Sequence, residues 1–321
     1  QQAKTLLMLP DYFGFRLTGN KLSEYTNGST TQLVDPHTYQ WDKELIRKLG
    51  YPEDIFLPLQ MPGTKVGQLL PEIQKEVGFD LEVVLCGSHD TASAVMAVPQ
   101  TEGDGIYISS GTWSLMGIES LKPVITEDAA AANFTNEGGY DHRFRFLKNI
   151  MGLWMIQSVR HEYQDAYSFA QLCDMAEESR DFSSRVDVND QSFLSPDSMI
   201  EAIKQYCQKT SQPVPETVGE LAAVVYRSLA QSYGETVKEL ETIAGRIYDS
   251  IHIIGGGSNA AYLNQLTADA TGKTVYAGPG EATAIGNLLA QMIHAGDLAD
   301  LKGARQCVRD SFEIKTYVPE N

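Results

Sequence analysis

Several features that mark metal-binding, secreted or membrane proteins are scarce in this sequence. Its four cysteines follow neither a CxxC pattern nor the spacing of metal ligands: Cys86, Cys173, Cys207 and Cys307. Scattered cysteines of this kind are typical of a reducing compartment, so we predict a cytoplasmic protein. No apolar run approaches the roughly 20 residues that a membrane-spanning helix needs, and we expect no membrane partner.

Positive charge is also scarce. The chain has 25 Lys and Arg against 42 Asp and Glu, which gives a formal net charge of −17 at pH 7. Without a basic surface the chain has nothing to hold a phosphate backbone, so nucleic acid and anionic membranes are excluded as expected partners. A small phosphorylated ligand is not excluded, because backbone N–H groups and a metal ion can hold it without Lys or Arg.

The composition is otherwise that of an ordinary globular protein. Hydrophobic residues make up 42% and charged residues 21% of the sequence, as in soluble domains. A length of 321 residues exceeds one typical core and suggests two domains.

The most informative stretch runs from Val83 to Gly117. A short β-branched run, 83–86, predicts a buried strand, and a helix is expected over 92–98, where Pro99 ends it. Asp90 lies in the polar loop between them. Two further strands are expected at 106–108 and 113–116, joined by the hydroxyl-rich loop 109–112. A carboxylate and a phosphate-sized loop therefore each follow a strand, and phosphoryl transfer needs that pair: one group orients and deprotonates a hydroxyl, and the other holds phosphate.

The last third of the sequence has the pattern of an α/β domain. A strand at 251–254 is followed by the loop Gly255–Gly257, a helix that ends at Thr271, a strand at 274–277 and a helix over 281–295. Helices are also expected over 1–9, 42–49, 71–77, 150–163, 169–178, 199–209 and 218–246, a strand at 144–147, a β-compatible stretch over 26–31 and a hairpin turn over 136–139.

Seven blocks of the sequence, in this order, resemble the FGGY family of carbohydrate kinases. They are LPDYFGFRLTG (9–19), EYTNGSTTQLVDP (24–36), GSHDTASAV (87–95), YISSGTWSLMG (107–117), GLWMIQ (152–157), IHIIGGGSN (251–259) and AGPGEATAIGN (277–287). The resemblance implies an α/β, actin-like ATPase fold: two domains built on a ribonuclease-H-like core, with the active site in the cleft between them. It assigns residues 1–100 to the end of the first, sugar-binding domain and residues 101–321 to the second, nucleotide-binding domain.

The HDT sequence at 89–91 and the SSGTWS loop are most similar to the members that act on L-rhamnulose. They imply ATP-dependent phosphorylation of the 1-hydroxyl, giving L-rhamnulose 1-phosphate in rhamnose catabolism, with Mg²⁺ bridging the phosphates. Two alternatives stay open: a kinase for another ketose or a polyol, and a non-catalytic nucleotide-binding fragment. The oligomeric state is not predicted.

Asp90 is the predicted catalytic residue. A carboxylate within hydrogen-bond reach of a sugar hydroxyl can take its proton as the bond to phosphorus forms. The alternative is a helix N-cap, since Asp between a strand and a helix is a common capping residue. The resemblance implies that His89, Asp90 and Thr91 bind the sugar; an exposed loop is the alternative for His89.

The nucleotide is assigned to residues from later blocks. The resemblance places Thr112 against the phosphates, although a plain hairpin turn explains the same loop. Three glycines between a strand and a helix permit close approach of a ligand at Gly255 and Gly256, but the spacing is neither GxGxxG nor GxxxxGK, and a tight β–α turn is the alternative. Asn149 and Gln157 match positions that contact ATP in the family; a surface helix position is the alternative for Gln157.

Three further interpretations complete the prediction. The small residues of 282–287 allow close approach of a second helix or of an adenine. The three tryptophans are predicted to lie in the core rather than to stack on a ligand: Trp41, Trp113 and Trp154. No side chain is predicted to be a protein ligand of a metal.

One block of the family is not found in this sequence. FGGY kinases begin with a metal-associated aspartate and a phosphate loop of the DxGT/S type, and neither is present here. We therefore expect an incomplete first domain, further natural residues before Gln1, and negligible turnover by residues 1–321 alone.

Overall fold

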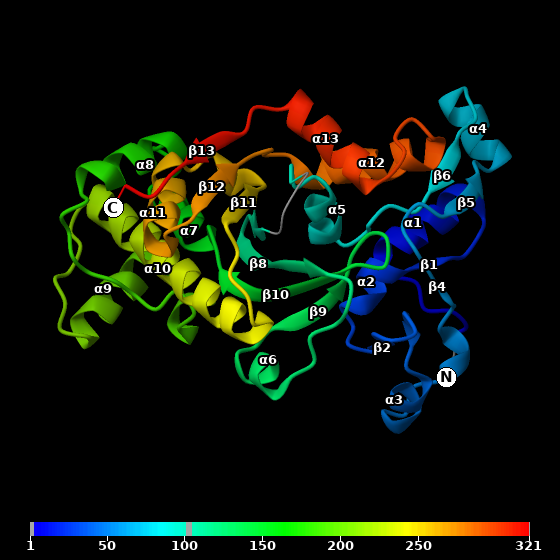
Figure 1. The fold of residues 1–321 in the computed structure, drawn as a ribbon, viewed down its shortest axis with the longest axis horizontal. Coiled ribbons are helices and arrows are strands. Elements are labelled where there is room, and N and C mark those ends of the chain that lie inside the picture. The colour runs from blue at the N-terminus through cyan, green and yellow to red at the C-terminus, as the bar shows by residue number, and fades with distance from the viewer. Residues whose placement is uncertain (1–2, 101–104, 321) are drawn as a thin grey trace.

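A mixed β-sheet lies at the centre of the computed structural model, which describes residues 3–100 and 105–320 (Figure 1). Within those residues the sheet has seven strands in the order β13-β12-β11-β7-β8-β10-β9. Their bounds are β7 Ile106–Ser110, β8 Trp113–Ser120, β9 Thr135–Gly138, β10 Phe144–Met151, β11 Ser250–Ile254, β12 Thr274–Ala277 and β13 Lys315–Tyr317. The strands β7, β8, β10 and β9 pair antiparallel, β11 and β12 continue the sheet parallel to β7, and β13 closes the edge antiparallel.

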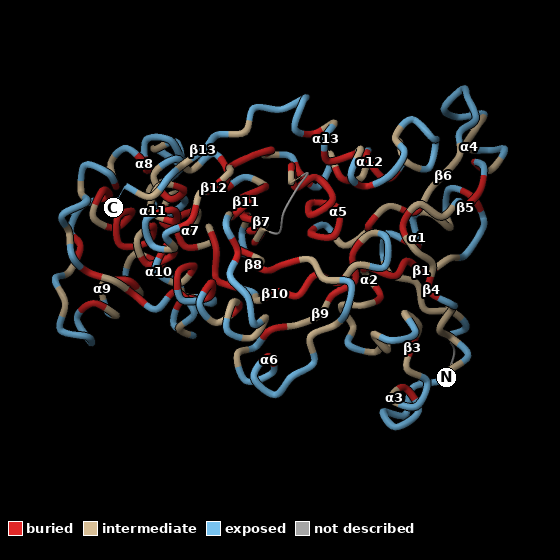
Figure 2. The backbone as a smooth tube through the Cα atoms, in the orientation of Figure 1, coloured by how far each residue is buried: buried red, intermediate tan, exposed pale blue. Residues whose placement is uncertain are grey.

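Both faces of this sheet are covered. Ile106 and Ile108 of β7 pack into one hydrophobic cluster, and Tyr107 between them packs into another, because successive side chains of a strand point to opposite faces. Figure 2 shows the resulting buried centre of the molecule. A strand that is buried on both faces has a continuous apolar sequence. For this reason β7 and β11 could be predicted from the sequence.

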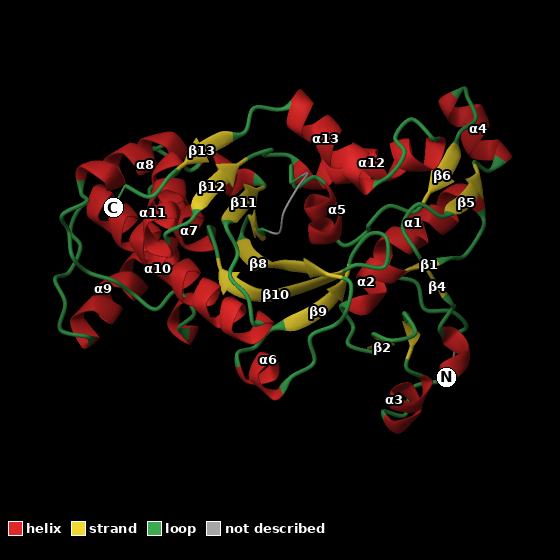
Figure 3. Cartoon of the chain, in the orientation of Figure 1, coloured by secondary structure: helices red, strands yellow, loops and turns green. Residues whose placement is uncertain are grey.

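Two groups of helices cover the two faces (Figure 3). The larger cluster is built around α10 (Val218–Ala244), which packs on α8 (Phe169–Glu178), α11 (Ala261–Thr271) and α7 (Trp154–Glu162), with α9 (Met199–Lys209) beyond α7. The other cluster contains α5 (Asp90–Met96), α12 (Ala282–Ala295) and α13 (Leu301–Ser311). The short α6 (Glu127–Ala131) lies between β8 and β9 in the chain.

The elements from α1 to β6 form the other end of the molecule, drawn in blue to cyan in Figure 1. Within the described residues they contain three two-stranded sheets, β1–β4, β2–β3 and β5–β6. The elements are α1 Leu9–Thr18, β1 Ser23–Glu24, α2 Tyr25–Ser29, β2 Val34–Asp35, β3 Gln40–Trp41, α3 Lys43–Lys48, β4 Leu59–Gln60, β5 Lys65–Gln68, α4 Pro71–Val77 and β6 Glu82–Val84. The C-terminal part of α12 contacts this end through His294, which bonds the carbonyl oxygen of Gly63 and the carboxylate of Glu82.

Most of the predicted elements are confirmed. The helices over 71–77, 169–178 and 199–209 have the predicted bounds, and those over 42–49 and 218–246 are shorter by one or two residues at an end. Turn chemistry explains this accuracy. Asp42 caps α3, and Gly78 ends α4 with a positive φ of 85°.

Two predictions in the first hundred residues are wrong. The helix expected over 1–9 is not formed in its described part; α1 instead begins at Leu9 with Pro10 in its first turn, a position where proline loses no helical hydrogen bond. The β-compatible stretch 26–31 contains α2, because the carboxylate of Glu24 accepts hydrogen bonds from the backbone of Thr26 and Asn27 and caps the helix.

Three other element boundaries also differ. The strand expected at 83–86 is β6, only half-buried and paired with β5 in a small sheet. The residues expected to form a hairpin turn, 136–139, include three residues of β9, and the turn follows Gly138. β10 continues through Asn149 to Met151, so the helix expected from 150 begins only at Trp154. The helix α13 and the strand β13 were not predicted.

No helix in the described part of the chain combines the length and apolar character required to cross a membrane. All four cysteines, which lie within the described residues, are free thiols. The predicted domain boundary between residues 100 and 101 lies at the edge of the segment 101–104, outside the described residues.

Candidate active site

A pocket of about 660 Å³ lies where the start of α5 faces the ends of β7 and β11. It is lined by residues that are distant in sequence: Thr30, His89, Asp90, Thr91, Ser109, Ser110, Gly111, Thr112, Trp113, Leu115, Glu137, Asn149, Gly255, Gly256, Gly280, Glu281, Ala282 and Thr283. All the predicted site residues are among them except Gln157, which lies on α7 away from the pocket lining.

Asp90 is the first residue of α5 and is accessible from the pocket. Its side chain is 78% exposed, and its Oδ1 accepts a hydrogen bond of 2.6 Å from the backbone N–H of Thr91. The N-cap position belongs to His89, whose side chain makes no capping bond. Asp90 is therefore not the N-cap, and its carboxylate is free to meet a ligand.

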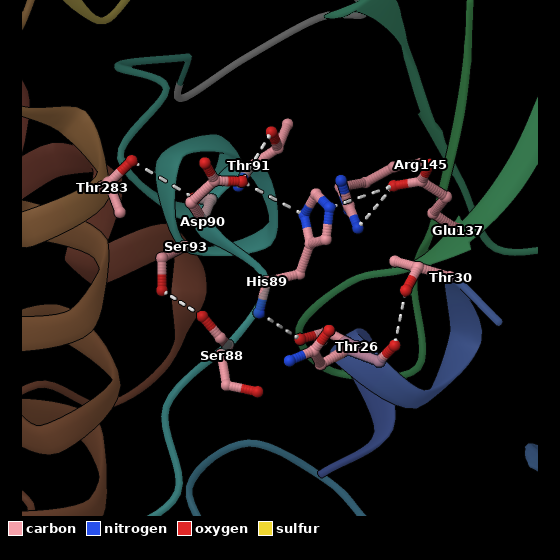
Figure 4. Close-up of polar contacts among 12 residues, drawn as sticks. Thr26, Thr30, Ser88, His89, Asp90, Thr91, Ser93, Glu137, Arg145 and Thr283 are labelled. Atoms are coloured by element: carbon pink, nitrogen blue, oxygen red, sulfur yellow. Dashed lines mark hydrogen bonds and ion pairs between the residues drawn. The ribbon is translucent and has the colours of Figure 1, made fainter. Parts of the chain in front are cut away.

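His89 lies between two carboxylates on the wall of the pocket (Figure 4). Its Nδ1 is 3.5 Å from Oδ1 of Asp90, and its Nε2 is 4.0 Å from Oε2 of Glu137. Burial, and next the charge of Arg145, lower the pKa of His89 below its ordinary value of 6.5. The imidazole is therefore neutral near pH 7, with one nitrogen that donates and one that accepts.

The backbone before Asp90 is held by Glu24, which is fully buried. Its carboxylate accepts bonds from the N–H and Oγ of Ser88 at 3.2 and 2.6 Å. The same carboxylate binds the N–H and Oγ1 of Thr26 at 2.7 and 2.6 Å and the N–H of Asn27 at 3.0 Å. Thr26 Oγ1 in turn accepts a bond of 3.3 Å from the N–H of His89. One carboxylate thus joins α2 to the loop that presents His89 and Asp90.

A second buried carboxylate, Asp11, lies next to Glu24. Its Oδ1 accepts a bond of 3.2 Å from the backbone N–H of Glu24, and its Oδ2 has no hydrogen-bond partner. Burial, and next the charge of Glu24, raise the pKa of Asp11 to about 6.

This raised pKa predicts a pH-dependent effect of Asp11→Asn on stability. The folded protein binds a proton at Asp11 more tightly than the unfolded chain does, so the stabilisation from this group is complete below the unfolded pKa of 3.8 and is lost as pH rises through about 6. Asparagine keeps the acceptor for the Glu24 N–H without the charge. We expect the difference in urea midpoint, Asp11→Asn minus wild type, to become more positive as the pH is raised from 4 to 7. A midpoint difference that stays constant over this range would contradict the expectation.

The loop 109–112 is a tight hairpin between β7 and β8. Ser110 pairs with Ser114 across it, and Gly111 N–H donates to the carbonyl of Trp113 at 2.9 Å. The carbonyls of Gly111 and Thr112 accept bonds from the backbone just before and at the start of α7, at 3.0 and 3.1 Å. The hairpin is thus fixed by β8 and α7, and it lines the pocket.

The glycine loop after β11 lies beside this hairpin because β11 pairs parallel with β7. Gly255 has a φ of +83°, and a Cβ there would lie 2.9 Å from the carbonyl oxygen of Ser110. Gly256 differs: its φ is not in the left-handed region, and no heavy atom lies within 4 Å of the position of a Cβ. Gly255 therefore serves the close approach of the two loops, whereas Gly256 faces open space in the pocket.

The remaining predictions for this region have mixed outcomes. The small residues of 282–287 serve helix packing, since a Cβ on Gly286 would lie 1.8 Å from the carbonyl oxygen of Ser93 on α5. Trp41 is buried and Trp154 packs partly buried against the core. Trp113 is 42% exposed and lines the pocket, so its assignment to the core is wrong: it is the first residue of β8, at the end of the strand that borders the pocket.

Several pocket residues were not predicted from the sequence. Thr30 and Glu137 reach it from α2 and β9, whereas Glu281 and Thr283 come from the start of α12. Thr283 Oγ1 also donates to the carbonyl of Asp90 at 3.3 Å, which joins α12 to α5. Glu281 and Thr283 could have been predicted from the turn 278–280. A glycine-proline-glycine turn before a helix brings the start of that helix close to the end of β12.

Models of one family match nearly the whole chain. The N-terminal domain of the FGGY family of carbohydrate kinases matches residues 1–97, and the C-terminal domain of the same family matches residues 106–295. The described structure is also similar to solved kinases, which supports the predicted fold. It matches a xylulose kinase from Rhodospirillum rubrum with a TM-score of 0.72 at 15% identity, over 97% of this chain and 62% of that one. A Plasmodium falciparum glycerol kinase with ADP matches with a TM-score of 0.73 at 14% identity, over 98% of this chain and 62% of that one.

Curated relatives are much more similar in sequence. A rhamnulokinase of Halalkalibacterium halodurans is 52% identical over 99% of this chain and 68% of its own length. A rhamnulokinase of Bacillus subtilis is 48% identical over 98% of this chain and 65% of its own length. The chain spans about two thirds of the length of such relatives. The resemblance inferred from the sequence blocks is confirmed, and the chain belongs to the FGGY family of carbohydrate kinases.

Proposed function

We propose that this protein transfers the γ-phosphoryl group of ATP to the 1-hydroxyl of L-rhamnulose. The observation that carries the proposal is the pocket in which the HDT residues at 89–91 face the hairpin 109–112 and the glycine loop 255–256. The identity of 42–52% to rhamnulokinases supports this substrate over other sugars, and the family implies ATP as the phosphoryl donor. The protein thus acts as a phosphotransferase with an alcohol group as acceptor.

The proposed mechanism divides the pocket into two ends. His89, Asp90 and Thr91 hold the sugar, and Asp90 accepts the proton of the 1-hydroxyl as its oxygen attacks the γ-phosphorus in line with the departing ADP oxygen. Thr112, Asn149, Gln157, Gly255 and Gly256 are assigned to ATP. Gln157 lies on α7 and, unlike the other four, does not line the pocket.

Mg²⁺ fits the pocket through one of its carboxylates. No Lys or Arg is among the described residues that line it, so these residues supply no cation to offset the phosphate charge. Glu281 is on its wall and would hold the ion, since Mg²⁺ typically binds one or two carboxylates together with phosphate oxygens and water. When bound, the ion supplies the positive charge that phosphoryl transfer requires.

The two domains of the family define the proposed division of labour. Residues 1–100 supply His89, Asp90 and Thr91 to the sugar side, and residues 101–321 supply the residues assigned to ATP; the two family matches, 1–97 and 106–295, support this division. The free thiols suit the reducing cytoplasm, which is the proposed location.

The proposal is tested with the protein expressed from its complete reading frame. ADP release is measured with L-rhamnulose, D-xylulose, L-ribulose, D-fructose and glycerol, and we expect the largest kcat/KM with L-rhamnulose. A larger kcat/KM with another acceptor would replace the substrate assignment. ATP binding without turnover of any acceptor would favour the non-catalytic alternative.

Gly256→Val is expected to weaken ATP binding without unfolding the protein. The valine side chain would extend into open space in the pocket rather than into the protein, so it would obstruct the nucleotide and leave the turn intact. Calorimetric titration with ATP checks this, with the thermal midpoint as the control for folding. An unchanged ATP affinity would show that the loop Gly255–Gly257 is a structural turn that does not contact the nucleotide.

A further inference from the structure

Glu137 is a carboxylate on the sugar side of the pocket for which the proposed mechanism has no role. It lies on β9, only 9% of the residue is exposed, and it lines the pocket together with Thr30, His89 and Asp90. Its Oε2 is buried and, apart from the ion pair with Arg145, makes no hydrogen bond. A carboxylate oxygen can accept more than one hydrogen bond, and buried polar atoms are expected to have partners, so Oε2 can still accept from a ligand donor.

A buried arginine fixes the position of this carboxylate. Nη2 of Arg145 lies 3.0 Å from Oε2 of Glu137, and the Arg145 side chain is completely buried. The guanidinium is itself held by a bond of 3.0 Å from its Nε to the carbonyl of Gly138. A charge pair removed from water in this way is costly to break, so the Glu137 carboxylate keeps its place on the pocket wall.

The spacing between Glu137 and His89 is suited to a bridging hydroxyl. Oε2 of Glu137 and Nε2 of His89 are 4.0 Å apart, beyond direct hydrogen-bond distance. A hydroxyl between them can donate to the carboxylate and accept from the imidazole, since it carries both functions. The Nδ1 of His89 lies 3.5 Å from Oδ1 of Asp90 but makes no hydrogen bond, so no bond in the structure fixes the proton on Nδ1, and Nε2 can carry it.

We propose that Glu137 is a sugar-binding residue that determines specificity. The 3- or 4-hydroxyl of the ketose donates to Oε2 of Glu137 and accepts from Nε2 of His89. This contact places the sugar chain against β9 and directs the 1-hydroxyl to Asp90, the neighbour of His89 in sequence. The inference rests on the proposed sugar kinase function and adds a specificity contact to it.

The test compares Glu137→Gln with a matched control in the protein expressed from its complete reading frame. The control is Glu239→Gln. Glu239 lies on α10 and forms an ion pair with Lys148 of β10, so the substitution also removes one negative charge from an ion pair. Acceptors are L-rhamnulose and its 3-deoxy and 4-deoxy analogues. Loss of a hydrogen bond to a charged group costs about 10- to 100-fold in kcat/KM. We expect that loss for Glu137→Gln with L-rhamnulose, an unchanged KM for ATP, and no loss for the control.

The deoxy analogues separate a binding role from a structural one. If Glu137 binds a hydroxyl, the analogue that lacks it is poor for wild type, and the Glu137→Gln variant discriminates against that analogue less than wild type does. Equal losses for all three acceptors, or unchanged kcat/KM in Glu137→Gln, would overturn the assignment. If the Glu137→Gln variant does not fold, the wild-type protein alone is measured. Equal kcat/KM for all three acceptors would then also overturn the role assigned to Glu137.

Failure of this inference is distinguishable from failure of the proposed function. Wild type that does not phosphorylate L-rhamnulose contradicts the substrate assignment. The same comparison is then made with the best acceptor from the ketose panel and its deoxy analogues, and it supports or overturns the role of Glu137 by the same criteria.

Discussion

Asp90→Asn is expected to lower kcat for L-rhamnulose at least about 100-fold, the lower end of the usual contribution of general acid–base catalysis. Asparagine retains the size of the side chain and can still accept the bond from the Thr91 N–H, which is 2.6 Å from Oδ1 in the wild type. It cannot accept the proton of the sugar hydroxyl. Since the Asp90 side chain is 78% exposed, its replacement leaves the packing of α5 unchanged, and ATP affinity is expected to stay near wild type.

Steady-state ADP release by the protein expressed from its complete reading frame measures this effect. Asp80→Asn is the matched control, because Asp80 is an exposed carboxylate outside the pocket, and it is expected to retain full turnover. If Asp90→Asn retains the wild-type kcat, another group takes the proton, and Asp90 has only a structural role at the start of α5.

Glu24→Ala is expected to have the largest effect on stability. The carboxylate accepts hydrogen bonds from Thr26, Asn27 and Ser88, and all of them lose their acceptor when it is removed. An unsatisfied buried donor costs about 1–3 kcal/mol, so we expect the free energy of unfolding to fall by at least about 3 kcal/mol. Urea denaturation measures the loss.

Two milder variants separate stability from positioning. Glu24→Gln keeps the side-chain volume but turns an amide NH₂ toward donors that a carboxylate accepted, so both stability and kcat should fall, by less than in the alanine variant. Ser88→Ala removes one bond of 2.6 Å and should cost less than either change at Glu24. An unchanged urea midpoint for Glu24→Ala would contradict the role assigned to this carboxylate.

Local chemistry made β7, the hairpin after it and the last third of the chain predictable. Glycine and proline marked the ends of α4, α11 and α12, and apolar runs marked β7 and β11, which are buried on both faces. Because β11 pairs parallel with β7, two loops identified separately in the sequence meet at one edge of the sheet. Parallel pairing is what makes such loops converge.

The sugar side of the pocket depends on contacts that local pattern does not contain. The glycines of 136–139 predicted a turn, yet Gly138 is a strand residue because Tyr25 of α2 packs against it: a Cβ there would lie 2.4 Å from the tyrosine ring. Without β9 at this position, Glu137 could not be placed beside His89. The helix α2 was missed for a related reason, since its cap, Glu24, is fixed by Ser88, which is 64 residues away.

A crystal structure of the protein expressed from its complete reading frame, with L-rhamnulose and a non-hydrolysable ATP analogue bound, tests the central claim most directly. We predict that the 1-hydroxyl lies within hydrogen-bond distance of the Asp90 carboxylate. The terminal phosphate is predicted to face the hairpin 109–112 and Gly256. A sugar bound outside this pocket, or one bound inside it with the 1-hydroxyl directed away from Asp90, would contradict the account.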